Sequence, residues 1–174
     1  MMFTRRSLLL AGLFLSGCSW LKPNPEEPVR RLTGQFLLKD ARTNQRFSAR
    51  YRIEQSPDKI RLDILGPLNA VLARLESDGS GITFTEAGKA PVTERDVDAF
   101  MNRTLGFSVS LPCLLDWLFG EPDSTIPFKF IEKDVFEQSG WRIRILERAE
   151  QNNRVRRLQL EKATTSILLT VSDP

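Results

Sequence analysis

The chain has 174 residues, of which 25 are Lys or Arg and 22 are Asp or Glu, so its formal net charge is only +3. This length is sufficient for one domain with a hydrophobic core, and the near balance of charge gives no support for nucleic-acid binding. The sequence contains no histidine, which excludes Ser-His-Asp and Cys-His catalysis and removes the most common metal ligand.

The first 17 residues have the pattern of a secretory signal peptide. Two arginines precede an apolar run at 8–15, which is too short to cross a bilayer because a spanning helix needs roughly 20 apolar residues. Small residues then lead into Cys18. The order Leu15-Ser16-Gly17-Cys18 resembles the bacterial lipobox, in which the cysteine receives diacylglycerol and an N-acyl chain and becomes the first residue of the mature protein.

The lipobox implies a mature chain that begins at Cys18 and is anchored in the outer membrane, since Ser19 stands where an aspartate would favour inner-membrane retention. Removal of residues 1–17 takes away two of the 25 basic residues and lowers the net charge from +3 to +1. Residues 18–29 contain three prolines among polar residues, which predicts a semi-rigid, extended tether. With Cys18 acylated, Cys113 has no partner, so we expect no disulfide.

Residues 30–174 are expected to form one mainly β domain with a few helices. Residues 46–55 alternate strictly between polar and apolar, the pattern of a strand with one face in water. A run of about nine to eleven such short antiparallel strands tends to curl into a barrel or half-barrel. The strands that this pattern predicts lie at 32–38, 46–55, 60–64, 71–75, 82–86, 90–92, 141–145, 156–162 and 166–172.

Two helices are predicted in the middle of this domain. Apolar residues fall at helical spacing between 97 and 105, after Thr93 and Asp96 in the order of a capping box and before a glycine, which favours a helix that ends there. A second helix is expected between Pro112 and Gly120. Because it is apolar almost all round, we expect it to cover the open face of the sheet as a lid.

Candidate catalytic groups are few. Asp96 and Asp98 lie two positions apart on a helix and do not face each other, and Glu26 and Glu27 lie in the tether. Asp116 is either a buried acid in its apolar helix or, more simply, a surface aspartate beside Arg or Lys. Since no phosphate-binding glycine loop or metal-ligand spacing is present in the sequence, we expect neither enzymatic activity nor a bound metal.

The inward positions of the predicted strands are apolar, and they form either a packed core, which is the simpler interpretation, or a hollow. Alternation alone does not distinguish the two. The strand arginines are expected on solvated outer faces, or alternatively at a site for an acidic partner or anionic lipid headgroups. These arginines are Arg46, Arg50, Arg52, Arg142, Arg144, Arg154, Arg156 and Arg157.

Together these features resemble the LolB family, the outer-membrane receptors for lipoproteins. The stretch "LGFSVSLPCLLDWLFGEP" carries the resemblance best, and the family's "NPLG"-type turn corresponds to residues 66–69, with Asn and Gly exchanged. The matching residues of the longer stretch are Gly106, Leu111, Pro112, Leu115, Trp117, Leu118, Gly120 and Pro122.

The resemblance implies an incomplete antiparallel barrel with a helical lid over a cavity for acyl chains. It also implies a LolA-like periplasmic carrier, acylated lipoprotein cargo, release into outer-membrane lipid, and a monomer with no cofactor beyond the acyl groups on Cys18. The residues that it places in the cavity are Phe36, Phe47, Tyr51, Ile60, Leu62, Phe84, Leu115, Trp117, Leu118 and Trp141.

The family's exposed apolar loop residue maps onto Leu68, in the same loop as Leu65 and Pro67. Leu68 is therefore expected to reach the membrane, whereas the alternative is that Leu65 and Leu68 fold back as a cap on the barrel rim. Two functions of different classes follow. A lipid-transfer receptor predicts a hollow interior that takes up acyl chains, and an accessory envelope lipoprotein that binds another protein through its Arg-rich strands predicts a filled one.

Overall fold

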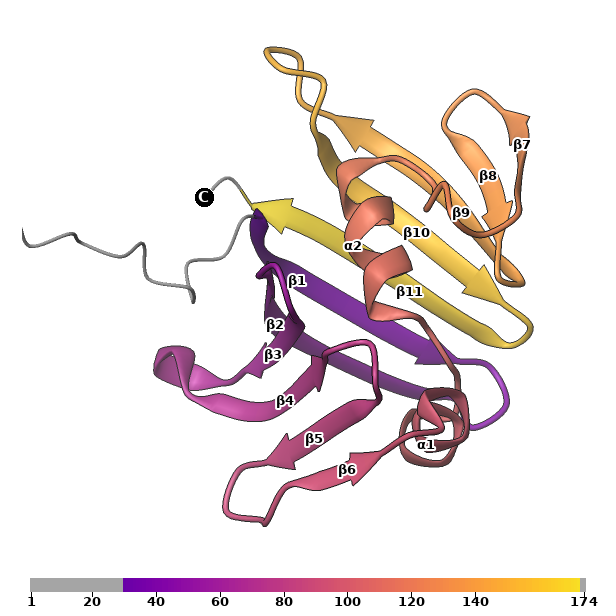
Figure 1. Cartoon of the computed structure of the whole chain (residues 1–174). Coiled ribbons are helices and arrows are strands. Elements are labelled where there is room, and N and C mark those ends of the chain that lie inside the picture. Colours follow the sequence, from indigo (N-terminus) through magenta and orange to yellow (C-terminus); the bar gives the residue numbers. More distant parts are fainter. Residues whose placement is uncertain (1–29, 173–174) are drawn as a thin grey trace, which may run out of the picture.

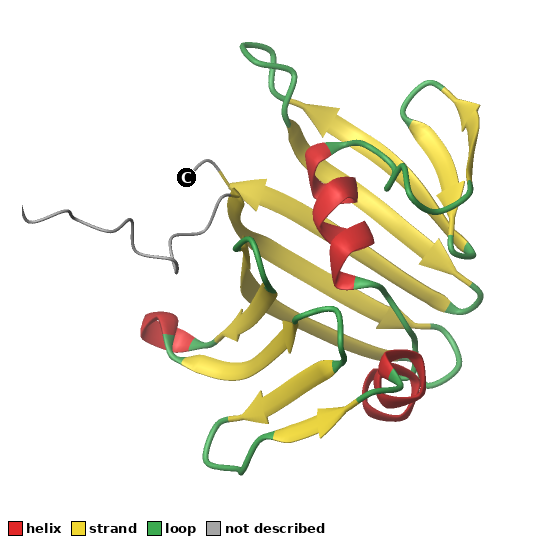
Figure 2. Ribbon diagram, viewed as in Figure 1, coloured by secondary structure: helices red, strands yellow, loops and turns green. Residues whose placement is uncertain are grey.

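The computed structural model describes residues 30–172 of the chain. The expected signal peptide, residues 1–17, and the tether at 18–29 with its lipidation site Cys18 lie outside the described residues. The described part forms one antiparallel sheet of 11 strands, two α-helices and a short 3-10 turn (Figures 1 and 2). The strands are β1 Arg30–Asp40, β2 Gln45–Gln55, β3 Ile60–Leu65, β4 Val71–Ser77, β5 Ile82–Glu86, β6 Val92–Glu94, β7 Phe128–Glu132, β8 Val135–Gln138, β9 Trp141–Arg148, β10 Val155–Lys162 and β11 Thr165–Ser172.

The strand order is β6-β5-β4-β3-β2-β1-β11-β10-β9-β8-β7, so β1 and β11, the first and last described strands along the chain, pair in the middle of the sheet. Among the described strands, the end strands β6 and β7 have no hydrogen bonds to each other, and the sheet stays open as it curves (Figure 1). This arrangement confirms the incomplete antiparallel barrel expected from the sequence. Alternation missed β7 and β8, because β7 exposes every side chain and carries a register shift.

Tyr51 connects the neighbouring strands β2, β1 and β11 in the middle of the sheet. It lies on β2, and its hydroxyl donates a 3.0 Å hydrogen bond to the carbonyl oxygen of Thr170 on β11. On β1, between them, is Gly34, where a Cβ atom would lie only 1.8 Å from that oxygen. Burial raises the pKa of Tyr51, because a phenolate is poorly solvated in the interior, so the hydroxyl remains a donor.

The two helices are α1, Val97–Leu105, and α2, Leu111–Phe119. The side chain of Asp96 caps α1 by accepting a 2.9 Å hydrogen bond from the Ala99 amide. The expected capping box was therefore wrong, since Thr93 lies in β6 and its hydroxyl is hydrogen-bonded to that of Thr83. Gly120 ends α2 in the left-handed conformation that glycine adopts without strain.

A buried hydrogen-bond network fixes α2 against the C-terminal half of the sheet. Gln138 at the end of β8 accepts from the Trp117 indole NH at 2.8 Å and from the Asp123 amide at 3.0 Å. Its own amide group donates to the carbonyl oxygens of Asp123 and Ile126. All four hydrogen-bonding positions of the side chain are thus occupied. In Figure 2, α2 lies across the concave face of the sheet, and it contacts both β10 and β3.

Candidate functional site

A hydrophobic cavity of about 360 Å³ lies between the helical segment and the sheet, where it is lined by strands β1–β5, β10 and β11. This volume is within the range of about 300–1,000 Å³ that is typical of ligand sites. Among the described residues that line the cavity, only Glu86 is charged, and its carboxylate pairs with Lys89 at 2.7 Å. The cavity can therefore hold an apolar ligand but offers little to a polar one.

Five of the ten residues expected in the cavity line it, and five do not. The first group is Phe36, Phe47, Tyr51, Leu62 and Phe84. The second group is buried in the packed core, and it comprises Ile60, Leu115, Trp117, Leu118 and Trp141. The physical reason is that the buried side of α2 packs against the sheet and fills the space beneath it, so that a cavity remains only beside α2, between α1, the segment that joins the helices, and parts of β1–β5, β10 and β11.

Several lining residues were not anticipated from the sequence. Phe107 and Val109 come from the segment that joins the two helices, where "GFSVS" alternates apolar and polar residues and so carried a weak signal. Met101 of α1 and Leu114 of α2 also line the cavity, although the sequence pattern predicts only that they lie in helices. Leu72 on β4 is the hardest to foresee, because its orientation depends on an irregularity in strand pairing.

The turn between β3 and β4 holds Leu68 away from the protein. Pro67–Asn69 form a 3-10 turn, closed by a 2.8 Å hydrogen bond from the Gly66 amide to the Ala70 carbonyl. Leu68 has φ 55° and ψ 25°, a left-handed conformation that costs a leucine about 1–2 kcal/mol. Its side chain is 101% exposed, so it does not fold back as a cap on the rim.

The other two residues expected in this loop have different environments. Leu65 ends β3 and is only 6% exposed, so it packs against the protein rather than projecting with Leu68. Pro67 is exposed at the first position of the turn. In Figure 2 the turn is the short coil that projects from the left side of the molecule.

Sequence and structural comparisons place the chain in a family. The family described as "Outer membrane lipoprotein LolB" matches residues 30–173. The chain belongs to the LolB family. The outer-membrane lipoprotein LolB of Cupriavidus metallidurans is 30% identical over 162 residues, which cover 84% of this chain and 79% of that protein. LolB of Neisseria meningitidis is 26% identical over 92% of this chain and 86% of that protein.

A solved structure supports the fold independently. A LolA superfamily protein from Nitrosomonas europaea matches 82% of this chain and 83% of its own chain with a TM-score of 0.50 at 10% sequence identity. Membership of the LolB family makes this chain an outer-membrane lipoprotein of the lipoprotein-localisation pathway. The resemblance that the lipobox and the α2 motif suggested is thereby confirmed.

The outer face beneath the turn of this LolB-family chain carries a cluster of ion pairs. Asp63 on β3 is fully buried and accepts hydrogen bonds from Arg52 at 2.7 Å and from Arg74 at 2.6 Å. Burial alone would raise the pKa of Asp63, but the hydrogen bonds and charges of Arg74 and Arg52 outweigh it and lower the pKa below its ordinary value. Arg52 and other strand arginines thus take part in ion pairs on the sheet.

Helix α2 also contacts Arg30, at the start of the described residues. Arg30, at the start of β1, forms a 2.8 Å ion pair with Asp116 and lies 3.9 Å from the ring centre of Phe119. Asp116 is thus a partly exposed carboxylate paired with an arginine, which confirms the simpler of its two interpretations. The contact joins the start of β1 to α2.

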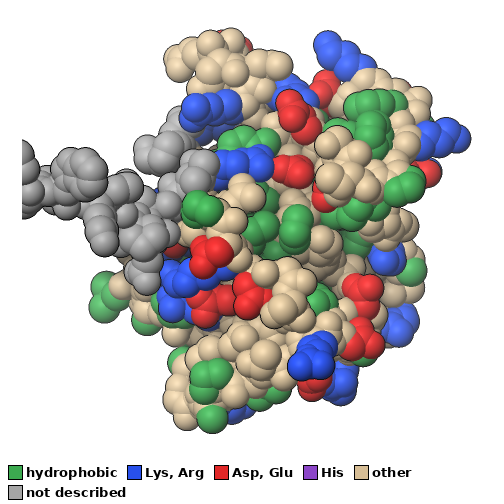
Figure 3. All heavy atoms as spheres, viewed as in Figure 1, with side chains coloured by type: hydrophobic (Ala, Val, Ile, Leu, Met, Phe, Trp, Pro, Cys, Tyr) green, Lys and Arg blue, Asp and Glu red, His purple; other side chains and the backbone are tan. Residues whose placement is uncertain are grey.

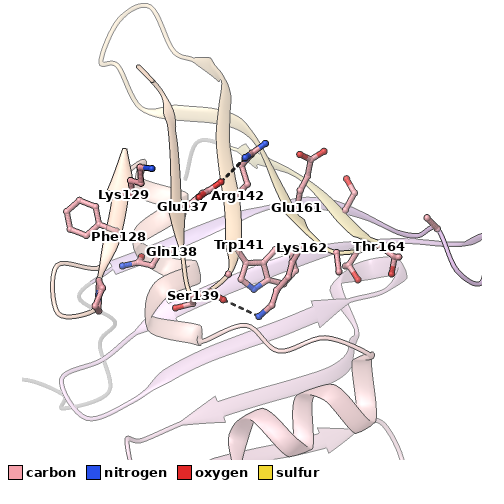
Figure 4. A pocket seen from close by; sticks show the side chains of 16 residues that line it. Phe128, Lys129, Glu137, Gln138, Ser139, Trp141, Arg142, Glu161, Lys162 and Thr164 are labelled. Carbon is pink, nitrogen blue, oxygen red and sulfur yellow. Dashed lines mark hydrogen bonds and ion pairs between the residues drawn. The ribbon is translucent and has the colours of Figure 1, made fainter. Parts of the chain in front are cut away.

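A second hollow, of about 860 Å³, is polar and lies at the turns between β8 and β9 and between β10 and β11 (Figure 4). Its charged side chains are engaged with their neighbours: Arg142 pairs with Glu137 at 2.8 Å, and Lys162 donates to the Ser139 carbonyl at 3.1 Å. This hollow therefore mixes charged side chains with apolar ones such as Phe128 and Trp141, and it suits an acyl chain less well than the first cavity does.

Hydrophobic side chains reach the surface at several places on the face that carries α2, between charged ones (Figure 3). Between Arg30 and Ser172, no cluster of three or more Cys, Asp or Glu side chains is placed to hold a metal ion. No helix in the same part of the chain is long and apolar enough to cross a bilayer.

Proposed function

We propose that this protein accepts the acyl chains of lipoproteins from a LolA-like periplasmic carrier and inserts them into the outer membrane. The observation that carries the proposal is the combination of an apolar cavity of about 360 Å³ with a fully exposed leucine on the adjoining β3–β4 turn. The family membership and the LolA-like fold support the same assignment. The proposed work is transfer of lipid, with no covalent reaction.

The energetics of acyl chains explain why a receptor of this kind is needed. Each methylene exposed to water costs about 0.8 kcal/mol, so a 14-carbon chain costs on the order of 11 kcal/mol. A barrier of that size slows release by roughly eight powers of ten. Cargo therefore has to pass between two hydrophobic cavities without meeting water, and a receptor that binds the chains more tightly than the carrier gives the transfer its direction.

The lipid anchor and the Leu68 turn have different roles in this transfer. Acylation of Cys18 would keep the domain at the membrane, where several acyl chains on one residue give stable attachment. Leu68 would enter the lipid interface when cargo is released, and burial of a leucine side chain stabilises that contact by about 1.5–3 kcal/mol. This gain is similar to or larger than the cost of the left-handed backbone at Leu68, which is about 1–2 kcal/mol.

Substitution of Leu68 tests the proposal. In Leu68→Glu we expect normal binding of a fluorescent fatty acid but insertion of a labelled lipopeptide into phosphatidylethanolamine–phosphatidylglycerol vesicles slowed by about tenfold or more, since a charge opposes entry into hydrocarbon. The matched control is Leu146→Glu, because Leu146 is a 40% exposed leucine on β9 that does not line the cavity. Equal insertion rates in the two variants would remove the turn from the mechanism.

The cavity itself is tested by titration of the full chain with a dansyl-labelled fatty acid. Saturable binding with one site per chain is expected, together with competition by unlabelled acyl chains. Absence of saturable binding would eliminate the receptor function.

A further inference from the structure

A β-bulge at Leu72 turns a leucine toward the cavity at the strand that leads out of the Leu68 turn. On β3 and β4, Ile64 pairs with Ala73 and Leu65 pairs with Val71, so Leu72 is an extra residue without a partner on β3. Strict alternation would place Leu72 on the outer face with Arg74, which pairs with the buried Asp63. The bulge instead places it among the cavity-lining residues, and such re-aiming of a side chain is a common role of bulges.

Leu72 is also in contact with the start of the turn. A Cβ atom added at Gly66 would lie 2.9–3.0 Å from the Leu72 side-chain carbons, so the leucine packs directly over the Gly66 backbone. Gly66 has φ −93° and ψ −161°, a conformation that any residue can adopt. Replacement of Gly66 by alanine would therefore displace the flexible Leu72 side chain without straining the backbone at residue 66.

The exposure of Leu72 fits a place at the mouth of the cavity. It is 43% exposed while it lines the cavity on its other side. Its backbone carbonyl accepts a 2.9 Å hydrogen bond from the Ala87 amide, which holds this point of β4 to the end of β5. Leu72 therefore lies between the cavity and Gly66, the residue that precedes the turn carrying Leu68.

We propose that acyl chains leave the cavity by passing over the side chain of Leu72 to the Leu68 turn and so enter the membrane. We call Leu72 the apolar step of this route. The inference rests on the function proposed above and adds a specific route to it. A chain that leaves the cavity would cross the 66–72 segment with less exposure of its methylenes to water. The rate of release would then depend on Leu72 more strongly than the affinity does, because Leu72 is one of many apolar residues that line the cavity and is half exposed at its mouth.

The test compares two leucines of similar exposure, Leu72 and Leu146, which are 43% and 40% exposed. The full-length lipidated chain is reconstituted into phosphatidylethanolamine–phosphatidylglycerol vesicles, and a pyrene-labelled dipalmitoyl lipopeptide is presented on albumin. Insertion is read by quenching from a labelled lipid, with protein-free vesicles as background. We expect Leu72→Asn to slow insertion by about tenfold, Leu146→Asn to leave it unchanged, and the affinity for a dansyl-labelled fatty acid to change by less than about threefold in both.

Two further variants cover the case in which Leu72→Asn does not fold. Leu72→Met keeps the step apolar and should transfer at nearly the normal rate. Gly66→Ala keeps every side chain apolar but displaces Leu72, and it should slow insertion while leaving the fatty-acid affinity intact. If Leu72→Asn and Gly66→Ala insert cargo as fast as Leu146→Asn, the step is refuted, and faster insertion would show that Leu72 is a plug and refute it equally.

These outcomes separate the step from the receptor function. If wild-type protein binds the fatty acid and Leu68→Glu blocks insertion, but the Leu72 and Gly66 variants behave normally, then only the route is overturned. If wild-type protein fails to bind the fatty acid, the receptor function and the step are refuted together.

Discussion

Binding of acyl chains should depend on chain length up to a limit set by the cavity. Hydrophobic cavities cost about 24 cal/mol per Å³ of empty volume, so filling about 360 Å³ provides at most roughly 8–9 kcal/mol. Because each buried methylene contributes about 0.8 kcal/mol, about ten or eleven methylenes fill the cavity. The dissociation constant should therefore fall about fourfold for each added methylene up to that length and then level off.

The variant Ala73→Leu should shorten this limit. Ala73 faces the cavity from β4, and the added isopropyl group occupies the space of about three methylenes. The plateau should then come about three methylenes earlier, and the affinity for long chains should fall by about 2.4 kcal/mol, on the order of sixtyfold. Short chains, which leave part of the cavity empty, should bind with nearly unchanged affinity.

Competition with a dansyl-labelled fatty acid measures both effects across a series of saturated fatty acids. Ala99→Leu is the matched control, because Ala99 is exposed on α1 and does not line the cavity. An affinity that keeps rising through the longest chains would refute the volume argument. So would an Ala73→Leu protein that binds long chains as tightly as Ala99→Leu does.

Three other substitutions test the interactions that hold the domain together. Asp63→Asn should destabilise the fold by about 2–4 kcal/mol at pH 7. The folded-state pKa of Asp63 is lowered, so the stability that its carboxylate contributes is complete above the ordinary pKa of about 3.9 and is lost as the pH falls through the folded-state value. The unfolding free energies of the wild type and Asp63→Asn, measured in urea, should therefore converge in acid. Arg30→Ala should release a bound dansyl-labelled fatty acid about fivefold faster in stopped flow, since loss of the contacts to α2 removes about 1 kcal/mol; an unchanged rate would show that they do not hold the lid. Gly34→Ala should lower the unfolding free energy by about 3 kcal/mol, because its Cβ would meet the Thr170 carbonyl oxygen at 1.8 Å, and a near-normal melting temperature would contradict this.

The sequence was sufficient for the open antiparallel barrel, because alternation is a local property of each strand. In β2, Tyr51 and Ile53 are buried while Arg50 is exposed, as the residue pattern predicts. The same reasoning could not assign the interior as filled or hollow. Whether two inward side chains meet depends on where α2 lies across the sheet, and this is decided by a non-local contact between Trp117 and Gln138.

The exposed Leu68 could be expected from the sequence, whereas the bulge at Leu72 could not. A resemblance in the residues around Gly66 was enough to expect an exposed Leu68, which the structure shows to be free of the protein surface. Leu72 has the spacing of an outward residue relative to Arg74, and only the register of β3 against β4 shows that it turns to the cavity. A bulge has no signature in one strand alone, since it is a property of the pair.

The division of the interior into a packed core and a cavity has an energetic reason. An empty cavity of about 360 Å³ costs up to roughly 8–9 kcal/mol, which is comparable with the whole net stability of about 5–15 kcal/mol of an ordinary domain. The fold therefore needs dense packing elsewhere, and it has this where Trp117 and Trp141 are buried beneath and beside α2. The residues of α2 thus form part of the packed core that offsets the cost of the cavity, and acyl cargo that fills the cavity should raise the stability of the domain as it binds.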